Sequence, residues 1–454
     1  MKTTPVLLGV VLFAACGEAT KTVRVVLEAP TLAAVDPGAI EARLAKVRVF
    51  VRDTGEGVIV RDLAPSERQV TVENYQTEET TVDVVVEGYD ELGTVVAYGR
   101  VEDVNVEEEE ATVNVPFRRS LAYVIHQPNP GQQRPDSAIY VLDLATRAFV
   151  GKVTIPGTAP SARGISAWGG QAMLVTFSDE GMGKVGVLST SDHTWQVHNL
   201  PQIQDLAIAG STSNTGLVAG GGRLNLIDLS SGAVETLAEG GGPLVIGGRV
   251  RDAAIGLGGR RAVVALDTNL AIVDLPNKAT RAVVLDSPGG VGLSADGITA
   301  FATSRTLPVA VEIALEQQTT DVRGAAFAGP TGIATYSDAI PGVLAVYTDE
   351  QNGASRVLGW EDGGSKLPDD QQVTTLRSAT GITSDGPGRR VVVVAAGTSS
   401  TTAGLTVIDT FSNQQPLQSS TALYPTDPDD NSAGDPLVSG TRYRPRGVAV
   451  IYGR

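Results

Sequence analysis

The sequence has one cysteine, three histidines and few aromatic residues. Because Cys16 has no second cysteine to pair with, the chain forms no internal disulfide and must be stable through burial of its core. Apart from a short apolar run near the N-terminus, no segment approaches the ~20 apolar residues of a membrane-spanning helix. The motifs HExxH, GxSxG and GxxxxGK[ST] are absent, so these hydrolase and nucleotide-binding signatures give no enzyme class.

Basic residues are outnumbered as well, and the formal net charge is −16. A chain of this charge is repelled by nucleic acid and by anionic lipid surfaces, so neither is expected as a direct ligand. The 52 glycines and 24 prolines, together with frequent valine, predict many short strands joined by tight turns.

The N-terminus reads as a signal peptide. Lys2 precedes an apolar run over residues 6–15, which is too short to span a bilayer. The residues Leu12-Phe13-Ala14-Ala15 before Cys16 resemble the lipobox of bacterial lipoproteins. The resemblance implies removal of residues 1–15 and acylation of Cys16, with palmitate among the acyl groups, and residues 16–20 as a lipidated tether. The alternative is an ordinary secretory signal cleaved after Gly17 or Ala19.

Several acyl chains on one cysteine would give a lasting anchor, because a single chain binds membranes only marginally. Gly17 stands where many lipoproteins of the inner membrane carry aspartate. The lipoprotein resemblance therefore implies an outer-membrane location, on either the periplasmic face or the cell surface.

Residues 21–118 contain seven runs in which valine alternates with polar residues, such as KVRVFVR and TTVDVVVEGYD. This period of two is typical of strands with one buried and one wet face. Seven such strands in this length predict an N-terminal Ig-like β-sandwich. The stretch VVVEGYDELGTVVAYGRVEDVNV also resembles the hairpin of small Ig-like domains in bacterial surface lipoproteins. The only helix predicted is DPGAIEARLA, over residues 36–45.

A repeat begins near residue 119 and extends to residue 454. Its units end a strand on aspartate before a polar turn, as in IYVLDL, LNLIDL, LAIVDL and LTVIDT. The successive positions are spaced by 46, 39, 46, 38, 47 and 50 residues: Asp143, Ser189, Asp228, Asp274, Glu312, Gly359 and Asp409. A four-stranded propeller blade takes about 40–50 residues, so the spacing predicts seven blades.

These units resemble the YVTN-type repeat of bacterial β-propellers, which places a "G-I-A-x-S-P-D-G" segment before a "V-x-V-I-D-x-x-T" strand. The first blade lacks its innermost strand, and the C-terminal segment RGVAVIYGR supplies one. The fold class predicted is therefore all-β: an N-terminal Ig-like β-sandwich followed by a seven-bladed β-propeller closed by the C-terminal strand. The repeated aspartate is interpreted as a turn former.

Candidate site residues are few. Cys16 is the predicted site of lipid attachment. Asp427, Asp429 and Asn431 resemble the start of a calcium loop, but Ser432 and Val438 replace the glycine and the acid that the loop requires, so a polar surface loop is favoured. His126, His193 and His198 are interpreted as surface or turn histidines, and no cofactor or catalytic residue is predicted.

Two functions remain open. One is a non-catalytic binding or scaffolding lipoprotein, whose partner is an envelope protein or an extracellular ligand. The other is an enzyme that resembles the lactonase-type propeller hydrolases or the quinoprotein dehydrogenases. No His, Glu and Arg set of the lactonases can be placed on this sequence, and only Trp168, Trp195 and Trp360 are available for the recurring tryptophans of the quinoproteins. Binding is therefore the preferred prediction, and the fold alone does not decide it.

Overall fold

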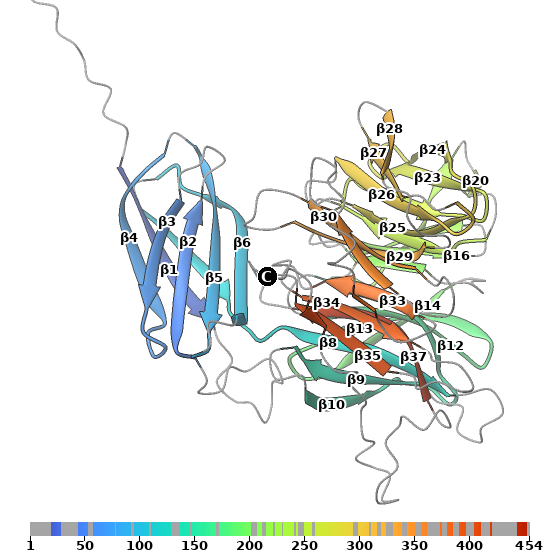
Figure 1. Cartoon of the computed structure of the whole chain (residues 1–454), viewed down its shortest axis with the longest axis horizontal. Helices are drawn as coiled ribbons and strands as arrows, with labels where there is room; N and C mark the ends of the chain where they lie inside the picture. The colour runs from blue at the N-terminus through green and yellow to red at the C-terminus, as the bar shows by residue number, and fades with distance from the viewer. Residues whose placement is uncertain are drawn as a thin grey trace, which may run out of the picture.

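A computed structural model gives the fold of the chain (Figure 1). It describes residues 20–28, 44–52, 58–77, 79–91, 95–108, 110–128, 137–144, 148–168, 172–200, 207–210, 215–220, 223–228, 230–239, 242–243, 249–256, 259–293, 298–307, 310–315, 319–323, 330–337, 343–349, 356–360, 373–374, 379–384, 390–395, 404–409, 418–419 and 443–451.

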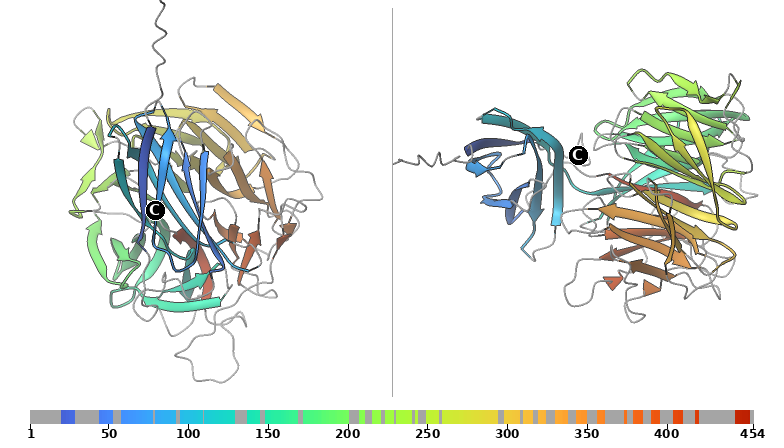
Figure 2. Two further views of the ribbon diagram at one scale, coloured as in Figure 1. Left: turned by 90° about the vertical axis from the view of Figure 1, so that its left-hand side faces the viewer. Right: turned by 90° about the horizontal axis from the view of Figure 1, so that it is seen from above.

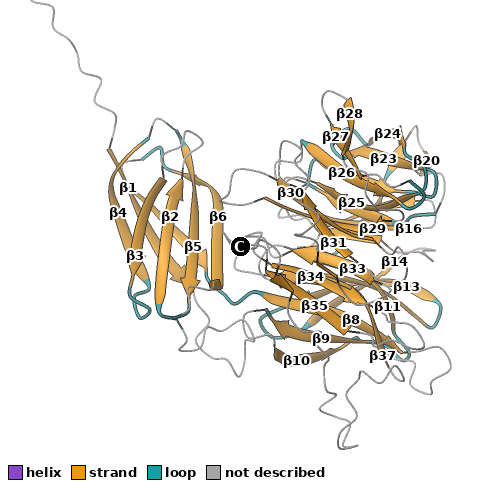
Figure 3. Ribbon diagram, in the orientation of Figure 1, coloured by secondary structure: helices purple, strands orange, loops and turns teal. Residues whose placement is uncertain are grey.

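All regular secondary structure in these segments is strand (Figure 3). The helix predicted over residues 36–45 falls mostly outside the described residues. In the described part of the chain, no helix is long and apolar enough to cross a membrane.

The first seven strands form two facing sheets. All seven runs predicted from the alternating valines are present as strands. One sheet has the order β4-β1-β7, from β1 (Thr20–Glu28), β4 (Gln69–Gln76) and β7 (Glu110–Pro116). The other has the order β3-β2-β5-β6, from β2 (Lys46–Arg52), β3 (Val58–Leu63), β5 (Thr81–Tyr89) and β6 (Val95–Asn105). Valines such as Val23, Val49 and Val84 are completely buried between the sheets.

The strand order of this sandwich differs from that of a constant-type immunoglobulin domain. In a constant-type immunoglobulin domain the first, second, fifth and fourth strands share a sheet. Here β1 pairs with β4 and, in parallel, with β7. The strands β2 and β5 lie in the other sheet, where β2 and β3 form a hairpin beside β5. The alternating pattern specifies which face of each strand is buried, but it does not specify the neighbouring strand, so it could not predict this order.

The remaining strands form seven four-stranded antiparallel sheets in the described residues, consistent with the blades of a propeller. A further pair, β19 (Ala238–Glu239) and β20 (Gly242–Pro243), forms a small ribbon. Blade one consists of β37 (Tyr443–Ile451), β8 (Leu121–Pro128), β9 (Ala138–Asp143) and β10 (Ala148–Thr154). Its innermost strand thus comes from the C-terminus, as the repeat phase predicted, and β37 pairs with β8 over its full length.

The other six blades follow the chain order from the innermost to the outermost strand. Blade two is β11 (Ser161–Trp168), β12 (Ala172–Asp179), β13 (Met182–Ser189) and β14 (Trp195–Leu200). Blade three is β15 (Ala207–Gly210), β16 (Thr215–Gly220), β17 (Arg223–Asp228) and β18 (Val234–Thr236). Blade four is β21 (Asp252–Ile255), β22 (Arg261–Ala265), β23 (Asn269–Asp274) and β24 (Ala279–Val284).

Blade five is β25 (Pro288–Leu293), β26 (Thr299–Ser304), β27 (Ala310–Ala314) and β28 (Thr319–Arg323). Blade six is β29 (Pro330–Ser337), β30 (Val343–Asp349), β31 (Arg356–Trp360) and β32 (Val373–Thr374). Blade seven is β33 (Ala379–Ser384), β34 (Arg390–Ala395), β35 (Gly404–Asp409) and β36 (Gln418–Ser419).

The innermost strands contact one another in an unbroken cycle: β37, β11, β15, β21, β25, β29, β33 and again β37. Apolar side chains fill the space between neighbouring blades. Val448 and Val450 of β37 pack against blade seven, whereas Ala449 and Ile451 of the same strand pack against blade two. The C-terminal strand therefore contributes to the cores on both sides of blade one.

Candidate functional site

Two sequence candidates cannot be placed. Cys16, the predicted lipid-attachment residue, and the loop with Asp427, Asp429 and Asn431 lie outside the described residues. In the segments that the structure does describe, no group of three or more His, Cys, Asp or Glu side chains is arranged to hold a metal ion.

The repeated aspartate acts as a turn former in blades three and four. The Asp228 Oδ1 atom accepts hydrogen bonds from the backbone N–H groups of Ser230 and Ser231, at 3.1 and 2.8 Å. Asp274 accepts hydrogen bonds from the backbone and side-chain amides of Asn277, and these bonds lower the pKa of Asp274. Both carboxylates are thus engaged by the turn that follows the third strand, as their spacing predicted.

Two of the repeat positions were misplaced by the sequence comparison. Asp143, Asp228, Asp274 and Asp409 each pair with the first residue of the preceding strand. In blade five this register position belongs to Ala314, two residues after Glu312. In blade six Gly359 pairs with Val346, inside β30, so it does not occupy this register position, and the position itself falls outside the described residues. Without an aspartate to mark the strand end, the short motif could not specify the register.

Asp143 occupies the repeat position in blade one but has a different partner. Its carboxylate is completely buried, and the Oδ2 atom lies 2.8 Å from Nη1 of Arg119. Arg119 belongs to the segment between the sandwich and the propeller. The next residue of this segment, Ser120, accepts a hydrogen bond of 3.1 Å at its carbonyl from the N–H of Leu144. This aspartate therefore fixes the connecting segment to the ring.

The sandwich stands over one face of the ring (Figure 2). The Arg390 side chain, at the start of β34, donates a buried hydrogen bond of 2.7 Å to the carbonyl of Val95 at the start of β6. Because strands alternate in direction, Arg390, Asp143 and the start of β8 lie at the same end of the blades. We call this end, which carries the turns after the first and third strands, the proximal face. The opposite end is the distal face.

The three histidines lie outside the innermost strands. His126 was expected at the surface, but β8 continues through it and its side chain is buried. It contacts Tyr140 edge-on and donates from Nδ1 to the Val124 carbonyl at 3.2 Å; burial lowers its pKa to about 4. His193 lies in a turn, with Nε2 3.3 Å from the Tyr123 hydroxyl, and His198 packs against Gly232. His193 and His198 therefore have separate surroundings.

Several innermost strands contain a β-bulge. At the bulge, the backbone of one innermost strand lies close to the backbone of the next. A Cβ atom at Gly290 would lie 2.8 Å from the nitrogen of Ile333 in the next blade, which explains the glycine. In blade four this position is Asp252. Its Oδ2 atom accepts a hydrogen bond of 3.0 Å from the N–H of Val291 in the next innermost strand. The repeat pattern did not lead us to predict Asp252 as a site residue. The signal that could have identified it is an acidic residue at a position where other repeats have glycine.

The environment of Asp252 disfavours its charge. The residue is only partly exposed, and protein surrounds the carboxyl group. Burial raises the pKa of Asp252 to about 6, against the opposing effect of the N–H groups of Val291 and Ala253. The carboxylate of Asp252 is therefore protonated within a range of pH in which an exposed aspartate is ionised.

We expect Asp252→Asn to stabilise the protein at pH 8. Because the pKa of Asp252 is higher in the folded chain, this group favours folding most below pH 4 and loses that contribution as the pH rises through 6. The loss amounts to at most about 3 kcal/mol. Asparagine keeps an acceptor for the Val291 N–H without the charge. Urea unfolding of both proteins between pH 4 and 8 measures the difference, and a difference that does not change with pH would contradict the assignment.

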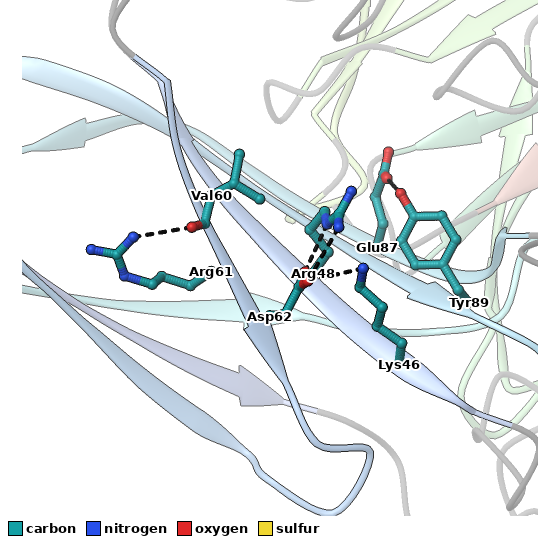
Figure 4. A network of polar contacts seen from close by, with 7 residues as sticks. All are labelled: Lys46, Arg48, Val60, Arg61, Asp62, Glu87 and Tyr89. Atoms are coloured by element: carbon teal, nitrogen blue, oxygen red, sulfur yellow. Dashed lines mark hydrogen bonds and ion pairs between the residues drawn. The ribbon is translucent and has the colours of Figure 1, made fainter.

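The outer face of the sheet β3-β2-β5-β6 carries a second polar network (Figure 4). Asp62 pairs with Arg48 at 2.7 Å and with Lys46 at 2.9 Å, which lowers the pKa of Asp62 to about 2. On the neighbouring strand β5, the Tyr89 hydroxyl donates to the buried carboxylate of Glu87 of the same strand. The ion pairs join adjacent strands of one sheet and the Tyr89–Glu87 bond lies within one strand, so the local structure of the sheet explains the network.

No family model matches the chain, and neither does any curated protein sequence. Solved structures similar to it include β-propeller proteins. Hydrazine synthase from Kuenenia stuttgartiensis is 16% identical with a TM-score of 0.42, over 56% of this chain and 79% of that chain. A chain of the mitotic checkpoint complex is 11% identical with a TM-score of 0.47, over 61% and 81%. TolB from Acinetobacter baumannii is 12% identical with a TM-score of 0.41, over 66% and 78%. Similarities of this size carry no argument about activity or partners.

Proposed function

We propose that the protein is a non-catalytic binding or scaffolding lipoprotein of the bacterial cell envelope, made of a β-sandwich and a seven-bladed β-propeller. Its N-terminal anchor would hold it at the outer membrane. The observation that carries the proposal is the cycle of innermost strands, which β37 closes into a ring. The distal face of this ring points away from the sandwich. A closed ring is rigid enough to present its connecting loops as one surface.

The placement of the described polar residues supports binding over catalysis. The repeated aspartates Asp228 and Asp274 are occupied by their turns, and Asp143 is paired with Arg119. His126 is enclosed in the core of blade one, on the second strand β8, which pairs with the innermost strand β37. No described cluster of side chains favours the lactonase-type or quinoprotein alternative, so binding is the function that we propose.

The anchor is tested by the variant Cys16→Ser. We expect it to be exported but no longer to partition with membranes, because serine cannot carry the thioether-linked lipid. Metabolic labelling with a fatty-acid analogue gives the direct measurement. Equal incorporation into the variant and the natural chain would contradict the lipoprotein assignment.

The binding function is tested by photo-cross-linking in intact envelopes, with the lipidated chain carrying a photo-reactive residue on the distal face and, separately, on the proximal face. A discrete cross-linked protein from either position supports a binding role. If neither position yields one, the proposed function is wrong.

A further inference from the structure

The acidic residues of the distal face are mostly engaged within the chain. Asp179 accepts two backbone hydrogen bonds from the connection between blades one and two and pairs with Lys184 at 2.7 Å. Asp267 pairs with Arg251 at 2.7 Å. Asp252 is bonded to the neighbouring blade as described above. Asp286 is exposed but accepts a hydrogen bond of 2.8 Å from the Thr306 hydroxyl, and Glu180 is exposed as well.

Three arginines on the same face are not engaged in this way. Arg163 lies near the start of β11, Arg223 begins β17, and Arg305 follows β26. Strand direction places all three on the distal face, in blades two, three and five. In the described part of the chain they form no ion pair. Arg163 and Arg305 are exposed, and Arg223 is half-buried.

Exposed apolar side chains accompany these arginines. Met182 and Leu307 are 55% and 44% exposed. Met182 begins the third strand of blade two and Leu307 follows the second strand of blade five, so both lie on the distal face. The proximal face differs, because it carries the repeated aspartates and contacts the sandwich. The chain as a whole has a net charge of −16. Arginines without an ion pair on one face therefore make that face complementary to negative charge, unlike the chain as a whole.

We infer that the distal face binds an acidic segment of a partner protein, with its carboxylates on Arg163, Arg223 and Arg305. Apolar side chains of the same segment would contact Met182 and Leu307. Guanidinium groups bind carboxylates through two parallel hydrogen bonds, and arginine and methionine are enriched in protein interfaces. This inference rests on the proposed function and specifies the chemistry of its partner.

The probe for this site is a fluorescent peptide of alternating glutamate and leucine, measured by anisotropy with the full chain carrying Cys16→Ser. We expect the triple variant R163E/R223E/R305E to weaken binding by at least about tenfold, because each contact becomes repulsive. Met182→Ser with Leu307→Ser should weaken it by about threefold. A peptide of alternating lysine and leucine should not bind. Unchanged melting temperatures would exclude misfolding of the variants.

The matched control is Arg260→Glu. Arg260 is exposed and lies in the turn before β22, on the proximal face, and its side chain forms no ion pair with a described residue. This variant should change the affinity by less than about twofold. Equal weakening by Arg260→Glu, or a triple variant that binds as tightly as the natural chain, would overturn the inference.

Cross-linking separates this inference from the proposed function. The photo-reactive residue replaces Met182 on the distal face or Ile298 on the proximal face. An acidic segment cross-linked at position 182, and lost in the triple arginine variant, supports the inference. Cross-links at position 298 alone overturn the inference but leave a binding protein. The absence of cross-links at both positions overturns the proposed function as well.

Discussion

Deletion of residues 443–454 should unfold the ring of blades while the sandwich stays folded. The deletion removes β37, the innermost strand of blade one, and with it Val448 and Val450 from one core and Ala449 and Ile451 from the next. Burial of one such valine or isoleucine contributes about 1.5–3 kcal/mol. The summed loss approaches the total stability of a domain, about 5–15 kcal/mol. β8 would then expose unpaired backbone groups that favour aggregation, and the two neighbouring blades would expose apolar side chains.

The deletion is checked by urea unfolding and by light scattering. Removal of residues 427–435 is the control for shortening the chain and should cost little. Two point variants test the role of β37 without shortening the chain. Val450→Asp introduces a charge at a side chain that is 3% exposed, and Val284→Asp introduces one at a side chain that is 91% exposed. We expect only the first to destabilise the ring severely. If the truncated protein unfolds at the same urea concentration as the full chain, the closure by β37 is unnecessary for stability.

Arg119→Ala should destabilise the propeller by about 3–5 kcal/mol, because it leaves the buried carboxylate of Asp143 without its cation. The carboxylate is completely buried, so water cannot replace the guanidinium. The effect should be visible as a lower urea midpoint, and limited proteolysis should cut the segment between the sandwich and the ring.

The control for this variant is Arg48→Ala. Arg48 forms an ion pair with Asp62 at 2.7 Å, close to the 2.8 Å between Arg119 and Asp143, but Asp62 is 49% exposed. An exposed pair contributes about 0–1 kcal/mol, so this variant should be nearly neutral. Equal effects of the two substitutions would show that burial of Asp143 does not determine the cost. The further variant Asp143→Asn in the Arg119→Ala background should recover stability, since it removes the unpaired charge.

The strands themselves were predictable because their signal is local. Alternating valines in residues 21–118 specify a buried and an exposed face, and all seven expected strands are present. The repeat phase from Asp143 to Asp409 likewise predicted the four-stranded sheets and the pairing of the C-terminal segment with β8. Where the marking aspartate is missing, the predicted positions were wrong: Glu312 lies two residues before Ala314, and Gly359 pairs within β30 and not with its first residue.

The amino-acid sequence alone therefore determined the strand content, the number of repeats and the partner of the last strand, because periodicity and spacing are properties of the chain itself. Only the tertiary structure decided the strand order of the sandwich, the burial of His126 and the pairing of Asp143 with Arg119. It also decided that Arg163, Arg223 and Arg305 lie on the face opposite the sandwich. These features depend on which distant segments meet, and identical local patterns are compatible with several such arrangements.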